Sequence, residues 1–422
     1  MARKSKHQNM PGERSIEVLI EEHEGVSLKK GSERALDRRL RIILILIAVT
    51  VVVFIVGLII PKNLFNETLH TTNYNDGYTL AWFIRDLSEN VNGLFAMLMG
   101  NVVAGNRTIN LATTYGVIIL CGAGLALCGA VYQGTFRNAL VSPSTLGVMS
   151  GAGLGMALWV VFFYDAGQSH GLWFESESLQ TVTDPLMSLW NSYGLALCSF
   201  VGCAIVVGLV MLVIGTVGRG STSGLMMIIV GQVIGSIMGA VSSTIRYYYI
   251  VVDPEGPQAD MMMQLQISSF YRSYSIIDLL AVGVPVLVMF LVVMHYRSQL
   301  TLLAFSEGEA RAMGVETRRM RFIIIALATL VTALIVSFCG RVGFVGFMVP
   351  HLARRIVGPN FTYLMPLSMV GGGVFVLVSY VLVTMFLGDG YATMSGMFIS
   401  IGGAIVFLVT AIRGVGSKRG TF

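Results

Sequence analysis

Residues 297–321 read RSQLTLLAFSEGEARAMGVETRRMR, and after one apolar span residues 339–355 read CGRVGFVGFMVPHLARR. The first stretch is charged, is about one helix long and lies between two hydrophobic spans. Charged side chains are costly inside a bilayer, so this stretch belongs at a membrane surface. We expect it to face the cytosol, where a separate protein can bind it.

The local chemistry of this stretch predicts a short surface helix. Ser306 and Glu309 form a capping box, in which each side chain accepts a hydrogen bond from the other residue's amide. Glu307 and Arg311 have the favourable i,i+4 order of charges. Gly314 is placed to end the helix in a left-handed turn.

One face of the predicted helix carries Ala310 and Met313, which can meet a partner, and the basic residues of 318–321 follow where the chain re-enters lipid. An ordinary charged loop of a membrane protein fits the same residues, because capping boxes are common.

The composition indicates a helical membrane protein. Of the 422 residues 55% are hydrophobic and 12% are charged, about half the charge of a soluble domain. Uncharged runs of membrane-spanning length recur, and in lipid only helices and closed barrels satisfy the backbone. The first 40 residues are hydrophilic, which argues against a secretory signal peptide. The net charge of +5 does not indicate nucleic-acid binding, because it is distributed by side of the membrane.

The predicted fold class is therefore all-α, a polytopic protein with about ten transmembrane helices. The expected spans are 42–60, 108–131, 146–164, 193–217, 224–246, 274–296, 322–340, a short one at 343–357, 362–387 and 391–412. The uncharged stretch 91–105 contains two asparagines and three glycines, and we expect it to form an external interfacial helix.

The distribution of charge predicts the orientation. If residues 1–41 are cytosolic and ten spans alternate, the inside segments hold 22 Lys/Arg and the outside segments hold five. This positive-inside bias places both termini in the cytosol. We expect a loosely ordered cytosolic tail at 1–41, a permease domain at 42–413 with an external segment at 61–107 and the cytosolic segment 297–321, and a cytosolic tail at 414–422.

Small residues mark helix contacts. Gly147, Gly151 and Gly155 form one small-xxx-small row, and Gly235 and Gly239 form another; both predict packing faces. The glycines of 371–373 are expected to loosen or bend their helix. The cysteines have no metal-site spacing and are expected to be small core residues without disulfides: Cys121, Cys128, Cys198, Cys203 and Cys339.

Five motifs, in this order and between these spans, carry a resemblance to a known family. They are GAVYQG at 129–134, RNALVSP at 137–143, LGVMSGA at 146–152, GEARAMGV at 308–315 and VGFVGFMVPHLAR at 342–354. Over residues 107–413 the chain resembles the permease subunits of type II ABC importers, the FecCD-like permeases that take up iron–siderophore complexes, haem and cobalamin.

This resemblance implies a ten-helix subunit that dimerises, as a homodimer or heterodimer, around a central pathway. Two ATPase subunits would bind on the cytosolic side, and a substrate-binding protein would bind outside. Residues 306–319 match the family's coupling helices, which seat on the ATPase. The coupling residues would be Ser306, Glu307, Glu309, Ala310, Arg311, Met313 and Gly314.

The resemblance also implies a cytoplasmic gate at Ser221, Thr222 and Ser223, although a polar turn after Gly218 and Gly220 explains the same residues. The chain departs from the family at 106–110, which replaces an Arg-Leu-Pro-Arg-like entry to the second span. Ala139 replaces the proline of Arg-Asn-Pro, and 394–397 replaces the Leu-Pro-x-Gly start of the last span.

No enzyme site or cofactor is predicted. The fragment 414–418 is too short for a Walker A motif and follows a membrane span, so ATP hydrolysis is expected in a partner chain. No nucleophile–base set and no metal-ligand cluster occurs. His351 is expected to be a polar residue at the end of a span.

Four of the five external cations are arginines that can meet acidic residues of a binding protein: Arg85, Arg107, Arg246 and Arg272. Anchoring to membrane lipid headgroups explains them equally well. Arg341 is a candidate pathway residue, because an intramembrane arginine is a functional candidate. Snorkelling to the outer interface also fits it.

Two other classes of protein compete with the importer. An ion-coupled secondary transporter would need intramembrane carboxylates, but Asp278 and Asp389 lie at span ends. A lipid-modifying membrane enzyme would need clustered Asp, His or Ser near one interface, and the sequence holds no such cluster. The expected location is the cytoplasmic membrane of a prokaryote.

Overall fold

The structure is a computed structural model that describes residues 39–58, 106–139, 141–164, 185–217, 224–254, 256–267, 269–270, 274–302, 313, 317–387 and 394–418. The chain divides into two compact units, Met1–Ala48 and Val49–Phe422. The division falls inside the helix Arg39–Leu58. The hydrophobic core lies within the second unit.

The described residues are helical, which confirms the predicted all-α class. The helices are α4 Asn106–Thr135, α5 Val148–Phe163, α6 Pro185–Val217, α7 Gly224–Tyr247, α8 Pro257–Ile267, α9 Ile276–His295, α10 Arg297–Leu302, α12 Thr317–Cys339, α13 Val345–Val357, α14 Phe361–Leu387 and α15 Ser395–Lys418, with short turns η1 Pro143–Leu146 and η2 Tyr248–Val252. Within the described ranges the extended pairing is an isolated antiparallel bridge between Ser269 and Gly340.

Each of the ten predicted spans coincides with a helix. Among the described residues, seven helices are long and apolar enough to cross a membrane: Arg39–Leu58, Leu111–Thr135, Tyr193–Thr216, Ile228–Val252, Ile276–His295, Met320–Cys339 and Phe361–Leu387. Val148–Phe163 and Ser395–Thr410 are shorter apolar helices. At 13 residues, α13 is about 20 Å long, which is too short to cross a hydrocarbon core of about 30 Å by itself.

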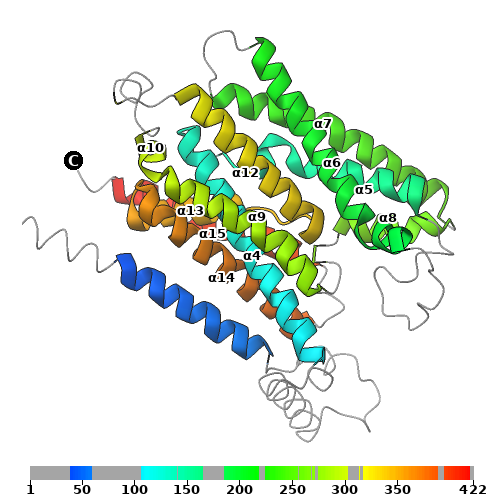
Figure 1. The fold of residues 1–422 in the computed structure, drawn as a ribbon, viewed down its shortest axis with the longest axis horizontal. Helices are drawn as coiled ribbons and strands as arrows, with labels where there is room; N and C mark the ends of the chain where they lie inside the picture. Colours follow the sequence, from blue (N-terminus) through cyan, green and yellow to red (C-terminus); the bar gives the residue numbers. More distant parts are fainter. Residues whose placement is uncertain are drawn as a thin grey trace, which may run out of the picture. The chain divides into compact units, whose positions relative to one another are not determined.

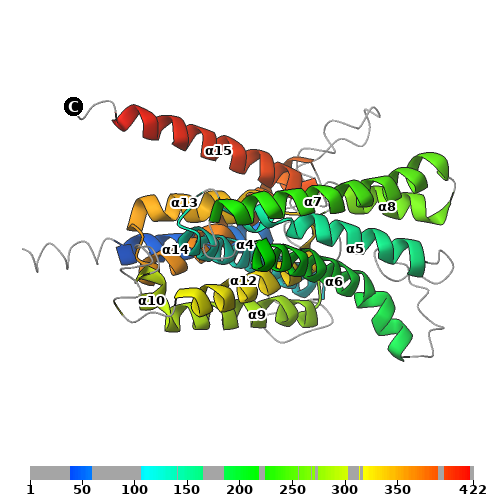
Figure 2. The ribbon, with the colours of Figure 1, turned by 90° about the horizontal axis from the view of Figure 1, so that it is seen from above.

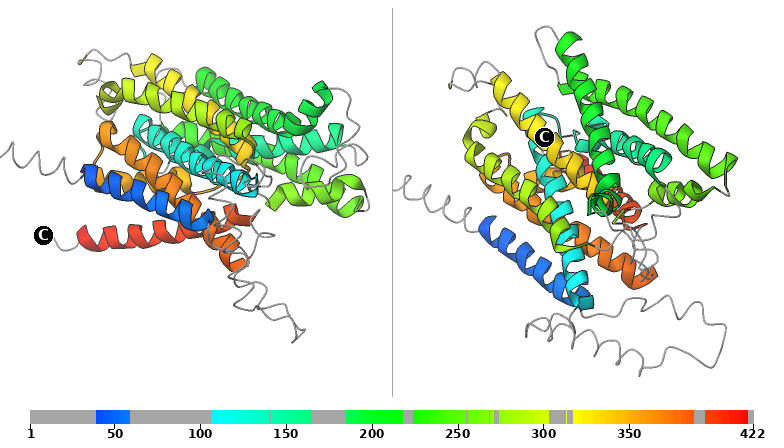
Figure 3. Two further views of the ribbon diagram at one scale, coloured as in Figure 1. Left: turned by 60° about the horizontal axis from the view of Figure 1, so that its bottom comes forward. Right: turned by 45° about the vertical axis from the view of Figure 1, so that its right-hand side comes forward.

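Helix α4 is the centre of the second unit. It contacts α9, α12, α13 and α14, which lie around it (Figure 1). Helices α5, α6 and α7 pack against one another beside this group, and α6 joins the two groups through its contact with α12. Helix α15 lies on the side of α13 and α14 (Figures 2 and 3). Residues inside α4 such as Ile118 and Cys128 are therefore fully buried.

The two glycine rows are packing faces, as predicted, and they meet each other. A Cβ on Gly235 of α7 would lie 2.8 Å from the Cα of Gly147 at the start of α5. Gly239 faces Ser150 on the next turn of α5. Further along the first row, Gly155 faces the backbone of α6. The spacing thus allows α5 to approach α6 and α7 closely.

The glycines of 371–373 lie inside the continuous helix α14, where Gly372 packs on the Gly122 backbone of α4. The five cysteines are free thiols, as expected, and all but Cys198 are fully buried. Helix α15 continues to Lys418, beyond the predicted end of the membrane domain at 413. The predicted interfacial helix at 91–105 lies outside the described residues.

Candidate functional site

Helices α4 and α13 cross in close contact. A Cβ on Gly129 would collide with the carbonyl oxygen of Gly346, in the first turn of α13. On the other side of this contact, a Cβ on Gly346 would lie 2.8 Å from the Leu125 carbonyl oxygen and 3.0 Å from the Pro143 ring. Helix α13 therefore begins against the interior of α4, well inside the bundle.

Buried hydrogen bonds hold the end of α4. The Nε2 of Gln133, which has no exposed surface, donates to the Phe347 carbonyl oxygen over 2.9 Å. The hydroxyls of Tyr132 and Thr329 lie 2.6 Å apart and join α4 to α12. Buried polar groups without partners are costly, so these contacts fix the relative positions of α4, α12 and α13.

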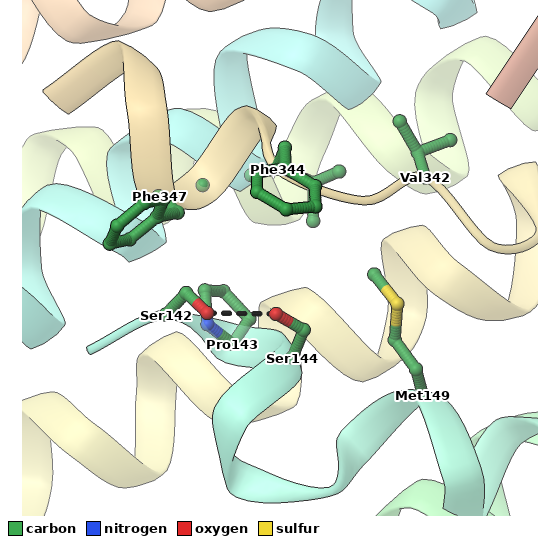
Figure 4. Close-up of a pocket in the computed structure, with 9 residues that line it drawn as sticks. Ser142, Pro143, Ser144, Met149, Val342, Phe344 and Phe347 are labelled. Atoms are coloured by element: carbon green, nitrogen blue, oxygen red, sulfur yellow. Dashed lines mark hydrogen bonds between the residues drawn. The ribbon is translucent and has the colours of Figure 1, made fainter. Parts of the chain in front are cut away.

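Two helices begin at opposite sides of one small cavity (Figure 4). Phe344 precedes α13 with a φ of 62°, and Gly147 precedes α5 with a φ of 76°. The cavity is small and partly open, so that its empty space of about 210 Å³ includes solvent at the mouth. It is lined by Leu125, Ser142, Pro143, Ser144, Met149, Val342, Phe344, Gly346 and Phe347. Figure 4 shows Phe344 and Phe347 facing Ser142 and Ser144, whose hydroxyls lie 2.8 Å apart.

Arg246 lies at the end of α7 with 6% of its surface exposed. Its Nη2 donates to the Gly153 carbonyl oxygen of α5 over 2.9 Å. The sequence placed this side chain at the external surface as a docking cation, and its burial does not favour that role.

Arg341 is exposed at a junction of three segments. Its neighbour Gly340 pairs with Ser269, and the Ser269 hydroxyl accepts a 2.6 Å hydrogen bond from the Gly396 amide at the start of α15. The Phe270 amide donates to the Cys339 carbonyl oxygen over 2.9 Å. The junction fixes the backbone at Arg341, where α12 ends.

The described residues before the predicted coupling segment are anchored in the bundle. Leu300 of α10 is fully buried, and the Thr301 hydroxyl accepts a 3.3 Å hydrogen bond from the Phe361 amide at the start of α14. Helix α12 begins at Thr317, within the last residues of the predicted coupling segment 306–319. Met313 is the member of the predicted coupling set that the structure describes, and 49% of its surface is exposed.

Most of the other predicted site residues lie outside the described residues. These are Arg85, Arg272, the gate residues 221–223, and the coupling residues of 306–311 together with Gly314. Arg107 is in the first turn of α4. The predicted roles of all these residues remain predictions. His351, expected to be polar and structural, packs its ring on Phe407.

Several features at this site were not predicted. The contact of Gly129 with Gly346 joins two motifs of the sequence, but neither motif shows what it touches. The hydrogen bond of Gln133 and the junction of Ser269 with Gly396 join residues more than 100 positions apart. A buried Arg246 could have been suspected from its place after an uncharged run of α7.

The chain is similar to transport proteins along most of its length. It is 30% identical to the cobalamin import system permease protein BtuC of Halobacterium salinarum over 61% of each chain. It is 30% identical to the molybdate import system permease protein MolB of Haemophilus influenzae over 61% of this chain and 67% of that one. The Fe(3+)-citrate import system permease protein YfmE of Bacillus subtilis is 28% identical over 62% and 68%.

A solved structure shares the fold. It is a metal-chelate type ABC transporter in an inward-facing conformation, with a TM-score of 0.64 and 23% sequence identity over 89% of this chain and 99% of that chain. The fold is thus that of a type II ABC importer permease, as predicted. The FecCD transport family matches residues 89–413, a range that includes all the helices from α4 to α14 and most of α15. This protein belongs to the FecCD transport family.

Proposed function

We propose that this chain is the transmembrane subunit of an ATP-driven ABC importer that moves an iron chelate, haem or a cobalamin-type ligand across the cytoplasmic membrane of a prokaryote. The observation that carries the proposal is the charged segment 303–316, which joins α10 and α12 of a FecCD-family protein. The flank before the segment is anchored, since Leu300 is buried and Thr301 is bonded to α14.

The mechanism is alternating access driven from the cytosol. Two ATPase subunits, which are separate chains, bind the segment through Ser306, Glu307, Glu309, Ala310, Arg311, Met313 and Gly314. When they close on ATP, the segment moves α10 and α12, and these helices shift the bundle between outward and inward access. Packed helices transmit such a movement because a close-packed interior has discrete arrangements.

The proposal implies further partners. A second permease subunit completes the pathway, and a substrate-binding protein delivers the ligand from outside. Arg85, Arg107 and Arg272 are proposed to meet acidic residues of that protein or lipid headgroups. Ser221, Thr222 and Ser223 form the cytoplasmic gate, and both termini are cytosolic. The names of the similar proteins, which import cobalamin and ferric citrate, support this class of ligand.

Gentle purification from the native membrane, followed by mass spectrometry and reconstitution, tests the proposal. We expect a stoichiometric ATPase subunit with a Walker A motif to co-elute. Uptake into liposomes of a ferric chelate, haem or cobalamin should then require ATP and the binding protein. A chain that elutes alone and moves solute with an ion gradient and no ATP would contradict the proposal.

A charge reversal tests the coupling segment directly. In the variant Glu309→Arg/Arg311→Glu we expect ATP-driven uptake to fall about ten-fold or more, because charged pairs at an interface are each worth about 1.5 kcal/mol or more. Insertion into the membrane should be unchanged, since the segment lies outside the spans. Uptake equal to that of the natural protein would show that these two side chains do not couple the subunits.

A further inference from the structure

Helix α7 carries polar side chains on an outer face inside a membrane span. Gln232, Ser236 and Ser243 lie within the candidate span Ile228–Val252, and all three are exposed. At about 100° per residue they fall within about 40° of one another around the helix axis. These three residues form the polar stripe. An exposed amide is costly against lipid, so this face of α7 suits water or a polar molecule better.

The polar stripe lies between two faces of different character. On one side of it, Gly235 and Gly239 pack on the start of α5. On the other side, Val233 and Ile237 are apolar, and 55% and 54% of their surfaces are exposed. That apolar face suits lipid or another apolar helix. The stripe is therefore a separate surface, which runs along the edge of the contact between α5 and α7.

This edge reaches the small cavity between the starts of α5 and α13. A Cβ on Gly231, the residue before Gln232, would lie 2.9 Å from the carbonyl oxygen of Thr145 in η1. Thr145 directly follows Ser144, which lines the cavity. Helix α7 thus packs on the short turn that carries the serines of the cavity. Gln232 and these serines therefore lie at the same level of the bundle.

The cavity and the stripe both present neutral groups. The hydroxyls of Ser142 and Ser144 lie on one side of the cavity, and the rings of Phe344 and Phe347 lie on the other (Figure 4). The residues that line the cavity are uncharged, and the stripe adds one amide and two hydroxyls. Such a surface binds through neutral hydrogen bonds and ring contacts, and it offers no counter-charge to an ion.

We propose that the polar stripe and this cavity form one wall of the path of the cargo through the membrane, where Gln232 and Ser144 contact the cargo and help to determine its specificity. The class of cargo that suits this wall is an organic complex with an uncharged, hydrogen-bonding outer surface. A bare oxyanion or metal ion would lose its hydration there without a counter-charge. The cargo part of this inference rests on the proposed import function, whereas the exposure of the wall to water does not.

Cysteines introduced singly into the full chain, in phosphatidylcholine nanodiscs, test the wall with charged methanethiosulfonate reagents that do not cross lipid. We expect Gln232→Cys, Ser236→Cys and Ser144→Cys to react about ten-fold faster than the controls, because the reactive thiolate is disfavoured in an apolar environment. The controls are Val233→Cys and Ile237→Cys, which directly follow two stripe residues in α7 but lie on its apolar face. The natural chain gives the background of its own five thiols.

The charge of the reagent tests the neutrality of the wall. The ratio of the rates of a cationic and an anionic reagent should lie within about three-fold of the ratio for free cysteine, because one fixed charge about 4 Å away would change each rate about five-fold even in water. A larger preference for either sign would overturn the assignment to an uncharged cargo.

Two results would overturn the wall itself. Equally slow reaction of stripe and control cysteines would place the stripe against lipid. A Gln232→Cys chain that cross-links to a second copy while its thiol stays protected would make the stripe a contact between copies. In the ATP-driven uptake assay described above, modified Gln232→Cys should lose most of its uptake and modified Ile237→Cys should keep it. Fast reaction at the stripe of a chain without ATP-driven uptake would instead contradict the proposed import function alone.

Discussion

At the scale of single residues, the contact of Gly129 with Gly346 is the most restrictive feature of the bundle. A methyl group on Gly129 would collide with backbone and not with a flexible side chain, so α4 and α13 would have to separate. In Gly129→Ala we expect a loss of about 1–3 kcal/mol of folding free energy from overpacking, which outweighs a gain of about 1 kcal/mol in helix propensity. A lower melting temperature in detergent would show this.

Gly208 supplies the matched control, because it is also inside a helix and nothing lies within 4 Å of a Cβ placed on it. Gly208→Ala should melt at the same temperature as the natural protein or slightly above it. If both variants were equally stable, the two helices would not be in the close contact described here.

Residue burial also explains why the sequence prediction placed Arg246 at the surface. Arg246 lies at the end of a predicted span. The sequence places such a residue at the membrane surface, because it does not show whether a neighbouring helix covers the side chain. Arg246 is buried because α5 packs along α7 and brings the Gly153 carbonyl oxygen to its guanidinium. Arg341 was proposed as a pathway candidate from its place between two spans, but the sequence does not show that the backbone beside it is held by a distant segment, through the pairing of Gly340 with Ser269.

At the scale of elements, long apolar runs made the ten helices predictable, because each backbone in lipid must satisfy its own hydrogen bonds. The glycine rows of α5 and α7 predicted packing faces but not that Gly147 meets Gly235. Hydropathy does not report depth, so it could not show that α13 begins beside Leu125 in the interior of α4. The cavity between the starts of α5 and α13 was unpredicted for the same reason.

The segment between α10 and α12 makes a prediction at this scale. Met313 is 49% exposed on a segment that follows the anchored helix α10, which suits an apolar contact with a partner. In Met313→Ala we expect weaker binding of the ATPase subunit, by about 1–3 kcal/mol, since a methionine buried at an interface loses most of its apolar surface on truncation. Co-elution at limiting ATPase concentration measures this loss.

Met263 of α8 is the control for that experiment, because it is 55% exposed and lies on the predicted external side. Met263→Ala should leave ATPase binding unchanged. A loss of the same size in both variants would indicate a general effect of truncating exposed methionines, and the assignment of the segment as the docking element would fail.

At the scale of the whole molecule, the division of the chain between Ala48 and Val49 separates the charged tail from the hydrophobic core. Every fully buried hydrophobic side chain belongs to the second unit, from Leu58 onward, within the described residues. The tail 1–41 holds ten Lys/Arg and seven Asp/Glu, a composition that buries little apolar surface and contributes little to a packed core.

Removal of residues 1–35 should therefore change the free energy of unfolding by less than about 0.5 kcal/mol, as is typical of surface regions. ATP-driven uptake should stay within about two-fold of that of the natural protein. Arg38, Arg39 and Arg41 remain in this variant and keep the positive-inside signal next to the first span. Uptake into liposomes and co-elution of the ATPase measure the two functions separately. Intact folding with lost ATPase binding would show that the tail is part of the docking surface, since the core that it leaves behind is complete.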